Sequence, residues 1–220
     1  MTRTDRIHLA LMLTLTFTTG INDAVGYLGL DRVFTGNMTG NVVVLGMALA
    51  GGTSLPVLGP ALALFGFMAG AAVGGRALKT SVRPWGSAST VLFGTVSATM
   101  LGLGVLLALA GDHPTHAVEV TTTTIAAVAM GLQAATARHV AVKDITTVVV
   151  TSTITGLAAD SPFGNGSSTA WRRRAGAIVL ILLGALLGAG LLRWHLAAPM
   201  LVAGALAAVA TAVGHRATDD

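Results

Sequence analysis

Long apolar runs separated by short polar segments organise the sequence. A transmembrane helix needs about 20 mostly apolar residues to cross the hydrocarbon of a bilayer. Six segments meet this requirement, and each predicts a transmembrane helix. They are residues 7–30, 57–78, 89–110, 117–138, 175–192 and 199–214.

Two further apolar stretches, residues 38–50 and 145–158, are too short to cross. At a rise of about 1.5 Å per residue each reaches about 20 Å as a helix, against a hydrocarbon core of about 30 Å. Short apolar elements of this kind fit re-entrant segments or half-helices. The pattern predicts an all-α integral membrane protein with about six transmembrane helices and two short re-entrant or half-helix elements.

The basic residues decide between a re-entrant and a crossing short element. Arg3 and Arg6 place the N-terminus in the cytoplasm by the positive-inside rule. If residues 38–50 enter and leave on the outer face, most later basic residues also fall inside. Those residues are Arg76, Lys79, Arg83, Arg138, Lys143, Arg172, Arg173, Arg174 and Arg216. Only Arg193 then lies outside, so we expect both termini to be cytoplasmic.

The composition agrees with a membrane protein. Hydrophobic residues make up 53% of the chain and charged residues only 10%, whereas soluble domains are about 25% charged. The 28 glycines suit close helix packing in lipid. The absence of cysteine excludes disulfides, thiol catalysis and cysteine-ligated metals. The net charge of +4 comes from clusters beside apolar runs, so we expect no nucleic-acid partner.

Three pairs of segments indicate an internal duplication. Residues 20–24 (GINDA) match 131–135 (GLQAA), residues 38–40 (MTG) match 154–156 (ITG), and residues 64–70 match 182–188. Each half then reads long helix, short element, long helix, long helix. An odd number of spans in each half inverts the halves relative to one another, as in many transporters. We therefore expect a first repeat at 1–111 and a second at 112–220.

Residues 20–30 (GINDAVGYLGL), 33–41 (VFTGNMTGN) and 130–135 (MGLQAA) carry a family resemblance, as does the threonine-rich stretch 146–160. Together they resemble the YoaK-like family of bacterial inner-membrane proteins, a group defined as a domain of unknown function. The resemblance covers most of the chain and implies an inner-membrane protein of about six helices. It implies neither a reaction nor a substrate.

Asn22 and Asp23 are candidate solute-binding residues in the outer half of the first helix. Ionisable side chains inside a span are costly and mark substrate or ion pathways. The alternative is that Asp23 caps a short helix or bonds to a neighbouring one. Gln133 occupies the matching position in the second half, where Ala134 replaces the aspartate.

The polar cluster Thr35, Asn37, Thr39 and Asn41 stands with two glycines at the start of the first short element. A helix N-terminus presents free N–H groups that attract anions and polar ligands. The cluster is therefore a second candidate binding segment. Helix capping and packing are the alternative interpretation.

The second short element contributes Thr147, Thr151 and Thr155, and Arg138 precedes it. These hydroxyls either line a polar path or bond back to their own helix. Arg138 is either an ordinary cytoplasmic-loop residue or a group that draws an anion towards the half-helix. We include all four among the candidate substrate-binding residues.

No nucleotide-binding loop, catalytic triad or zinc motif is present in the sequence. The spacing of His113 and His116 matches no dedicated metal motif. We therefore expect that the protein binds no metal or cofactor and is not an enzyme. The leading hypothesis is a small secondary transporter or channel-like permease for a small polar or anionic solute, which forms a homodimer through glycine-rich faces. A non-transporting membrane scaffold or accessory subunit is the alternative.

Overall fold

The computed structural model describes residues 3–51, 55–140, 150–161, 164 and 171–217, and every regular element in these ranges is a helix. The chain begins with α1 (Arg3–Ala24), which continues into a π-helical turn, η1 (Val25–Gly29). The remaining helices are α2 (Met38–Leu49), α3 (Leu58–Ala77), α4 (Ser87–Ala110), α5 (His116–Val140), α6 (Val150–Ala159), α7 (Trp171–Leu192) and α8 (Ala197–Arg216).

Six of these helices are long and apolar enough to cross a membrane, namely α1 with η1, α3, α4, α5, α7 and α8. The six predicted transmembrane helices are therefore confirmed. Helix α2 is the shorter apolar helix expected at residues 38–50. The second short stretch contains α6, but its beginning, including Thr147, lies outside the described residues.

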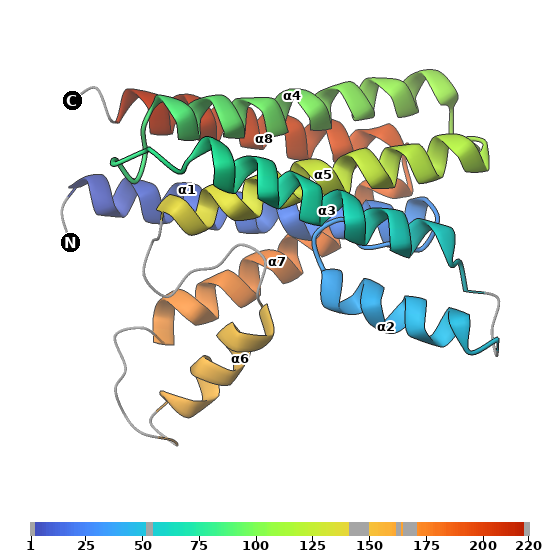
Figure 1. Cartoon of the computed structure of the whole chain (residues 1–220), viewed down its shortest axis with the longest axis horizontal. Helices are drawn as coiled ribbons and strands as arrows, with labels where there is room; N and C mark the ends of the chain where they lie inside the picture. The colour runs from blue at the N-terminus through green and yellow to red at the C-terminus, as the bar shows by residue number, and fades with distance from the viewer. Residues whose placement is uncertain (1–2, 52–54, 141–149, 162–163, 165–170, 218–220) are drawn as a thin grey trace.

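The long helices run side by side, and both termini lie at one end of the bundle (Figure 1). Helix α1 ends and α3 begins at the opposite end, with α2 between them, so α2 does not cross the bundle. Helix α5 ends and α7 begins at the terminal end, with α6 between them. The two short helices therefore belong to opposite ends of the molecule.

Most helix contacts have a counterpart when the two halves of the chain are exchanged. Helix α5 packs against α3 as α1 packs against α7, and α5 lies against α4 as α1 lies against α8. Helix α2 packs on α3, and α6 packs on α7. The helices α4 and α8 pack against each other.

Glycines make the two closest of these contacts possible. A Cβ atom at Gly131 would meet the carbonyl oxygen of Phe67 in α3, and one at Gly70 would meet that of Val128 in α5. Gly20 and Gly184 face the backbones of α7 and α1 in the same way. The glycine ladders thus pack helices within one chain, as small residues do in membranes.

These contacts also correct the register of the proposed duplication. Gly70 faces Val128, and Gly184 faces Phe17. Val128 stands three residues before Gly131, and Phe17 stands three residues before Gly20. Because Gly131 and Gly20 are matched in the proposed duplication, the glycines that face Val128 and Phe17 should match too. Gly70 therefore corresponds to Gly184. Matching residues 64–70 with 182–188 is therefore wrong by one helical turn.

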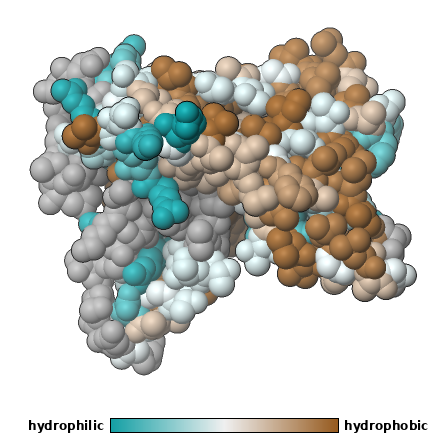
Figure 2. All heavy atoms as spheres, in the orientation of Figure 1, coloured by the Kyte–Doolittle hydropathy of each residue, from teal (hydrophilic) through white to brown (hydrophobic). Residues whose placement is uncertain are grey.

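Hydrophobic residues cover much of the end away from the termini on the face shown in Figure 2. On the face shown they gather over α2 and the neighbouring part of α3, where Val43, Met47 and Phe65 are exposed. Exposed apolar side chains on membrane helices contact lipid tails. Most of the hydrophilic residues on this face lie towards the end that carries the termini.

Arginines of four helices also gather at the end with the termini, because Arg76 and Arg138 close α3 and α5, Arg173 opens α7 and Arg216 ends α8. Arg32 and Arg193 belong to the opposite end. The prediction that Arg193 alone lies there is therefore wrong, because Arg32 follows η1 and precedes α2.

Candidate functional site at the crossing of α1 and α5

Four buried polar or sulfur-bearing side chains meet where α1 and α5 touch, and we name this cluster (Thr19, Asn22, Met130 and Gln133) the α1–α5 crossing. The Nδ2 of Asn22 donates to the Sδ of Met130 at 3.5 Å. The Nε2 of Gln133 donates to the Oγ1 of Thr19 at 3.3 Å. None of the four is more than 2% exposed. Asn22 and Gln133, predicted as a matched pair, are thus brought together across the bundle.

Asn22 retains an unused acceptor. Its Oδ1 is buried and has no hydrogen-bond partner among the described residues. Leaving a buried polar atom unpaired costs about 1–3 kcal/mol. Such groups are rare in native structures and call for an explanation such as a bound ligand or a functional role.

Thr19 completes the crossing because its hydroxyl is used twice. The Oγ1 donates to the carbonyl oxygen of Leu15 at 2.9 Å, so its lone pairs remain free to accept from Gln133. Thr136, one turn beyond Gln133, donates to the Leu132 carbonyl in the same manner. Back-bonded threonines present acceptors to the interior without leaving their own protons unpaired.

Asp23 ties the loop before α2 to this crossing. Its Oδ1 accepts from the backbone N–H of Gly36 at 2.7 Å and from the hydroxyl of Thr35 at 3.3 Å. A Cβ at Gly36 would lie 3.0 Å from Thr19 and 3.4 Å from Met130. The loop tip therefore sits directly against the α1–α5 crossing, and an anion at the Gly36 N–H would have to displace the Asp23 carboxylate.

The asparagines of the TGNMTGN segment have structural partners. Asn41 is 1% exposed, and its amide forms two hydrogen bonds with the backbone of Phe34. Its Nδ2 donates to the Phe34 oxygen at 2.6 Å, and its Oδ1 accepts from the Phe34 nitrogen at 2.9 Å. Asn37 caps α2 by accepting from Gly40 at 3.2 Å. The capping interpretation is confirmed for Asn37.

The other candidates lie away from the crossing. Thr39, Arg138, Thr151 and Thr155 are exposed. Thr155 donates to the Thr151 carbonyl oxygen at 3.0 Å, so this hydroxyl bonds back to its own helix. The structure gathers Asn22, Asp23, Thr35 and Gln133, with Asn41 and Asn37 holding the loop.

Thr19 and Met130 were missed by sequence reasoning. Each stands three residues before a predicted member, Asn22 or Gln133, and therefore on the same helix face. That spacing, applied to both halves together, is the signal that could have found them.

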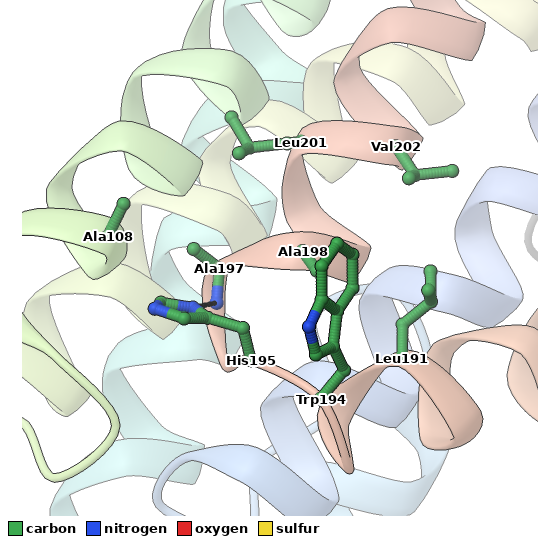
Figure 3. A pocket seen from close by; sticks show the side chains of 8 residues that line it. All are labelled: Ala108, Leu191, Trp194, His195, Ala197, Ala198, Leu201 and Val202. Atoms are coloured by element: carbon green, nitrogen blue, oxygen red, sulfur yellow. Dashed lines mark hydrogen bonds between the residues drawn. The ribbon is translucent and has the colours of Figure 1, made fainter.

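The described surface also carries an apolar groove of about 450 Å³ at the turn between α7 and α8 (Figure 3). Its walls include Ala108 of α4, Leu201 of α8 and the side chains of Trp194 and His195. His195 accepts from the backbone nitrogen of Ala197 at 3.1 Å and belongs to the turn. Because its lining is almost entirely apolar, this groove suits lipid contact and lies apart from the polar crossing.

The described residues form no cluster of three or more histidines, aspartates or glutamates that could hold a metal ion. His116 and Glu119 approach each other to 3.4 Å as a pair on the first turn of α5.

Comparisons with known proteins place these features in a family. The family described as a protein of unknown function, DUF1275, matches residues 11–213. The UPF0700 transmembrane protein YoaK of Bacillus subtilis is 31% identical over 154 residues, which cover 68% of this chain and 65% of that protein. The chain thus aligns with slightly less than two thirds of this curated relative. No solved structure matches the chain.

Proposed function

This chain belongs to the DUF1275 family of multi-pass membrane proteins, and we propose that it is a small secondary transporter or channel-like permease. Its solute is small and polar or anionic, and it passes the α1–α5 crossing. It carries out no chemical reaction and uses no cofactor.

The observation that carries this proposal is the free acceptor of Asn22 inside the bundle. Asn22 is 2% exposed and its Oδ1 is unpaired among the described residues, while Asp23 lies one residue away. Polar and ionisable groups inside a membrane are expensive and mark substrate or ion pathways. A solute with an N–H or O–H donor would satisfy Asn22 as it passes.

The proposal includes an inverted repeat, with the two short helices entering from opposite faces. Its support is the paired packing of the helices and the reciprocal bonds of Asn22 and Gln133. Transporters built this way place the substrate where the repeats meet. The crossing occupies the corresponding place in this chain.

The orientation follows from the basic residues. Their concentration at the end with the termini supports a cytoplasmic location for both termini by the positive-inside rule. The family resemblance supports the inner membrane. A homodimer would use glycines that meet nothing within 4 Å, such as Gly94 and Gly102 of α4, because the glycine ladders serve packing within the chain.

One observation favours the alternative of a scaffold or accessory subunit. Asp23, Asn37 and Asn41 spend their hydrogen bonds on the loop before α2. A protein that only holds a shape would use its polar residues in this manner. A transporter should carry a solute across the membrane of vesicles that contain this protein alone, whereas a scaffold should not.

Vesicle shrinkage and reswelling test the proposal. The purified full chain is reconstituted into liposomes, which are then exposed to glycerol, urea, or potassium nitrate and phosphate with valinomycin present. We expect faster entry of at least one solute than in protein-free vesicles, and a loss of that gain in N22L/Q133L. The matched control is T39A, which changes an exposed residue. Rates equal to those of protein-free vesicles for every solute would leave the scaffold function.

A further inference from the structure

Asp31 is a buried carboxyl outside the transmembrane helices, and the proposed solute path does not use it. It follows η1 at the end of the bundle opposite the termini. The residue is 8% exposed, and neither carboxyl oxygen has a hydrogen-bond partner among the described residues. The neighbouring Arg32 is exposed and has a φ of 59°.

The surrounding helices pack closely against the carboxyl, and the hydrogen bonding that they offer it is weak, coming from Thr123 and from the backbone of Asp31 itself. A Cβ at Gly59, in the first turn of α3, would meet the Oδ2 of Asp31. The Thr123 hydroxyl of α5 lowers the pKa of this carboxyl by hydrogen bonding. The same hydroxyl also donates to the carbonyl oxygens of Glu119 and Val120 in its own helix, which weakens its bond to Asp31.

The charged groups that face Asp31 lie on α5. Glu119 and His116 act electrostatically on the carboxyl, and among the described residues Asp31 belongs to none of the ion pairs. The side chain of Glu119 is 26% exposed and that of His116 is 69% exposed. Glu119 and His116 therefore lie between the buried carboxyl of Asp31 and water.

A buried carboxylate that is not held in an ion pair and is only weakly hydrogen-bonded is strongly unfavourable. Burial raises the pKa of Asp31, and the negative charge of Glu119 adds to this effect, while Thr123 and His116 oppose it. The neutral acid removes the cost of the buried charge. A bound metal cation is the other way to remove it.

We propose that Asp31 is a proton-binding site that exchanges its proton with water past Glu119 and His116. Uptake converts the carboxylate to the neutral acid, and release returns the proton to the aqueous phase at this end of the bundle. The site stands without the transport function. Only its role as the coupling site of a transporter would rest on the proposed function.

Labelling with dicyclohexylcarbodiimide tests the site, since this apolar reagent attacks protonated carboxyls. The full chain in liposomes is labelled from about pH 5 to about pH 9, above the ordinary carboxyl pKa of about 4, and modified peptides are located by mass spectrometry. We expect labelling at Asp31 that decreases as the pH rises. Asp112, an exposed carboxyl at the same end, should remain nearly unlabelled.

Two further measurements, and one result of the labelling itself, decide the outcome. E119Q should move the labelling midpoint of Asp31 to lower pH, because a negative neighbour is lost. An unlabelled Asp31 over the whole pH range, in protein that remains folded by size-exclusion chromatography, would overturn the proposal. If sodium but not choline protects Asp31 from labelling at constant pH, the site binds a metal cation and the proposal of a proton site is wrong. None of these readouts requires transport.

Discussion

Asn22 of α1 and Gln133 of α5 each donate to the side chain that stands three residues before the other. Asn22 reaches Met130, and Gln133 reaches Thr19. The proposed inverted repeat would produce this reciprocity, because it makes α1 and α5 equivalent. The contact between α4 and α8 is reciprocal as well, since Gly104 faces Leu201 and Gly204 faces Leu101.

The contact between α3 and α5 should tolerate no side chain at Gly131. We expect G131A to destabilise the protein by about 1–3 kcal/mol, because the new methyl group would collide with the Phe67 carbonyl. Thermal unfolding in detergent measures the effect. The control G75A, in α3, adds a methyl in open space and should be neutral or slightly stabilising, since alanine favours a helix by about 0.5–1 kcal/mol. Equal melting temperatures for the two variants would contradict the packing described.

Asn41 should stabilise the loop before α2. Replacing it in N41A removes two hydrogen bonds to the Phe34 backbone, and we expect a loss of about 1–3 kcal/mol. Hydrogen exchange of residues 33–41 should quicken in N41A, whereas the exposed change T39A should leave it unaltered. Unchanged exchange in N41A would show that the loop is held by other contacts.

Asp31 should make stability depend on pH. Burial raises the pKa of this carboxyl in the folded state, so the folded protein keeps a proton that the unfolded chain, with a pKa of about 3.9, has released. Stability should therefore fall as the pH rises from about 4 through the folded-state pKa. In D31N this decrease should be smaller than in the wild type, because one buried carboxyl is lost, and D112N should retain the full decrease. A wild-type profile that matches D31N in thermal unfolding would rule out the raised pKa.

Arg174 should hold α6 against α7. Its Nη1 donates to the Gly156 oxygen at 2.8 Å and pairs with Asp160. We expect R174Q to increase hydrogen exchange in α6, because the carbonyl and the carboxylate lose their cationic partner. R172Q, which changes an exposed arginine in the same turn, is the matched control. Equal exchange in both variants would mean that α6 is held by its apolar contacts alone.

The sequence predicted the fold closely because apolar run length governs helices in a membrane. All six long helices were expected, and α2 begins at Met38 as predicted. The π-helical turn after Ala24 was not foreseen, because hydropathy does not distinguish one helical hydrogen-bond pattern from another. The register of the third helix in each half was missed because glycines four residues apart give two equally good matches.

The candidate site was only partly predictable. Asn22, Asp23 and Gln133 stood out because polar residues are rare in apolar helices. Met130 looked like an ordinary apolar residue, and its role appears only when α5 meets Asn22. The direction of a side chain around a short helix also depends on tertiary packing, so the exposure of Thr151 and Thr155 could not be derived.

Access of water to the α1–α5 crossing tests the transport account most directly, and it requires no knowledge of the solute. The chain has no cysteine, so N22C, Q133C and T19C can each be treated in membranes with a small charged methanethiosulfonate reagent. M100C, in the apolar core, is the negative control, and T115C, in an exposed loop, is the positive control. The account predicts that the crossing cysteines react well above M100C. Crossing cysteines that stay as unreactive as M100C, in folded protein whose T115C reacts fully, would contradict it.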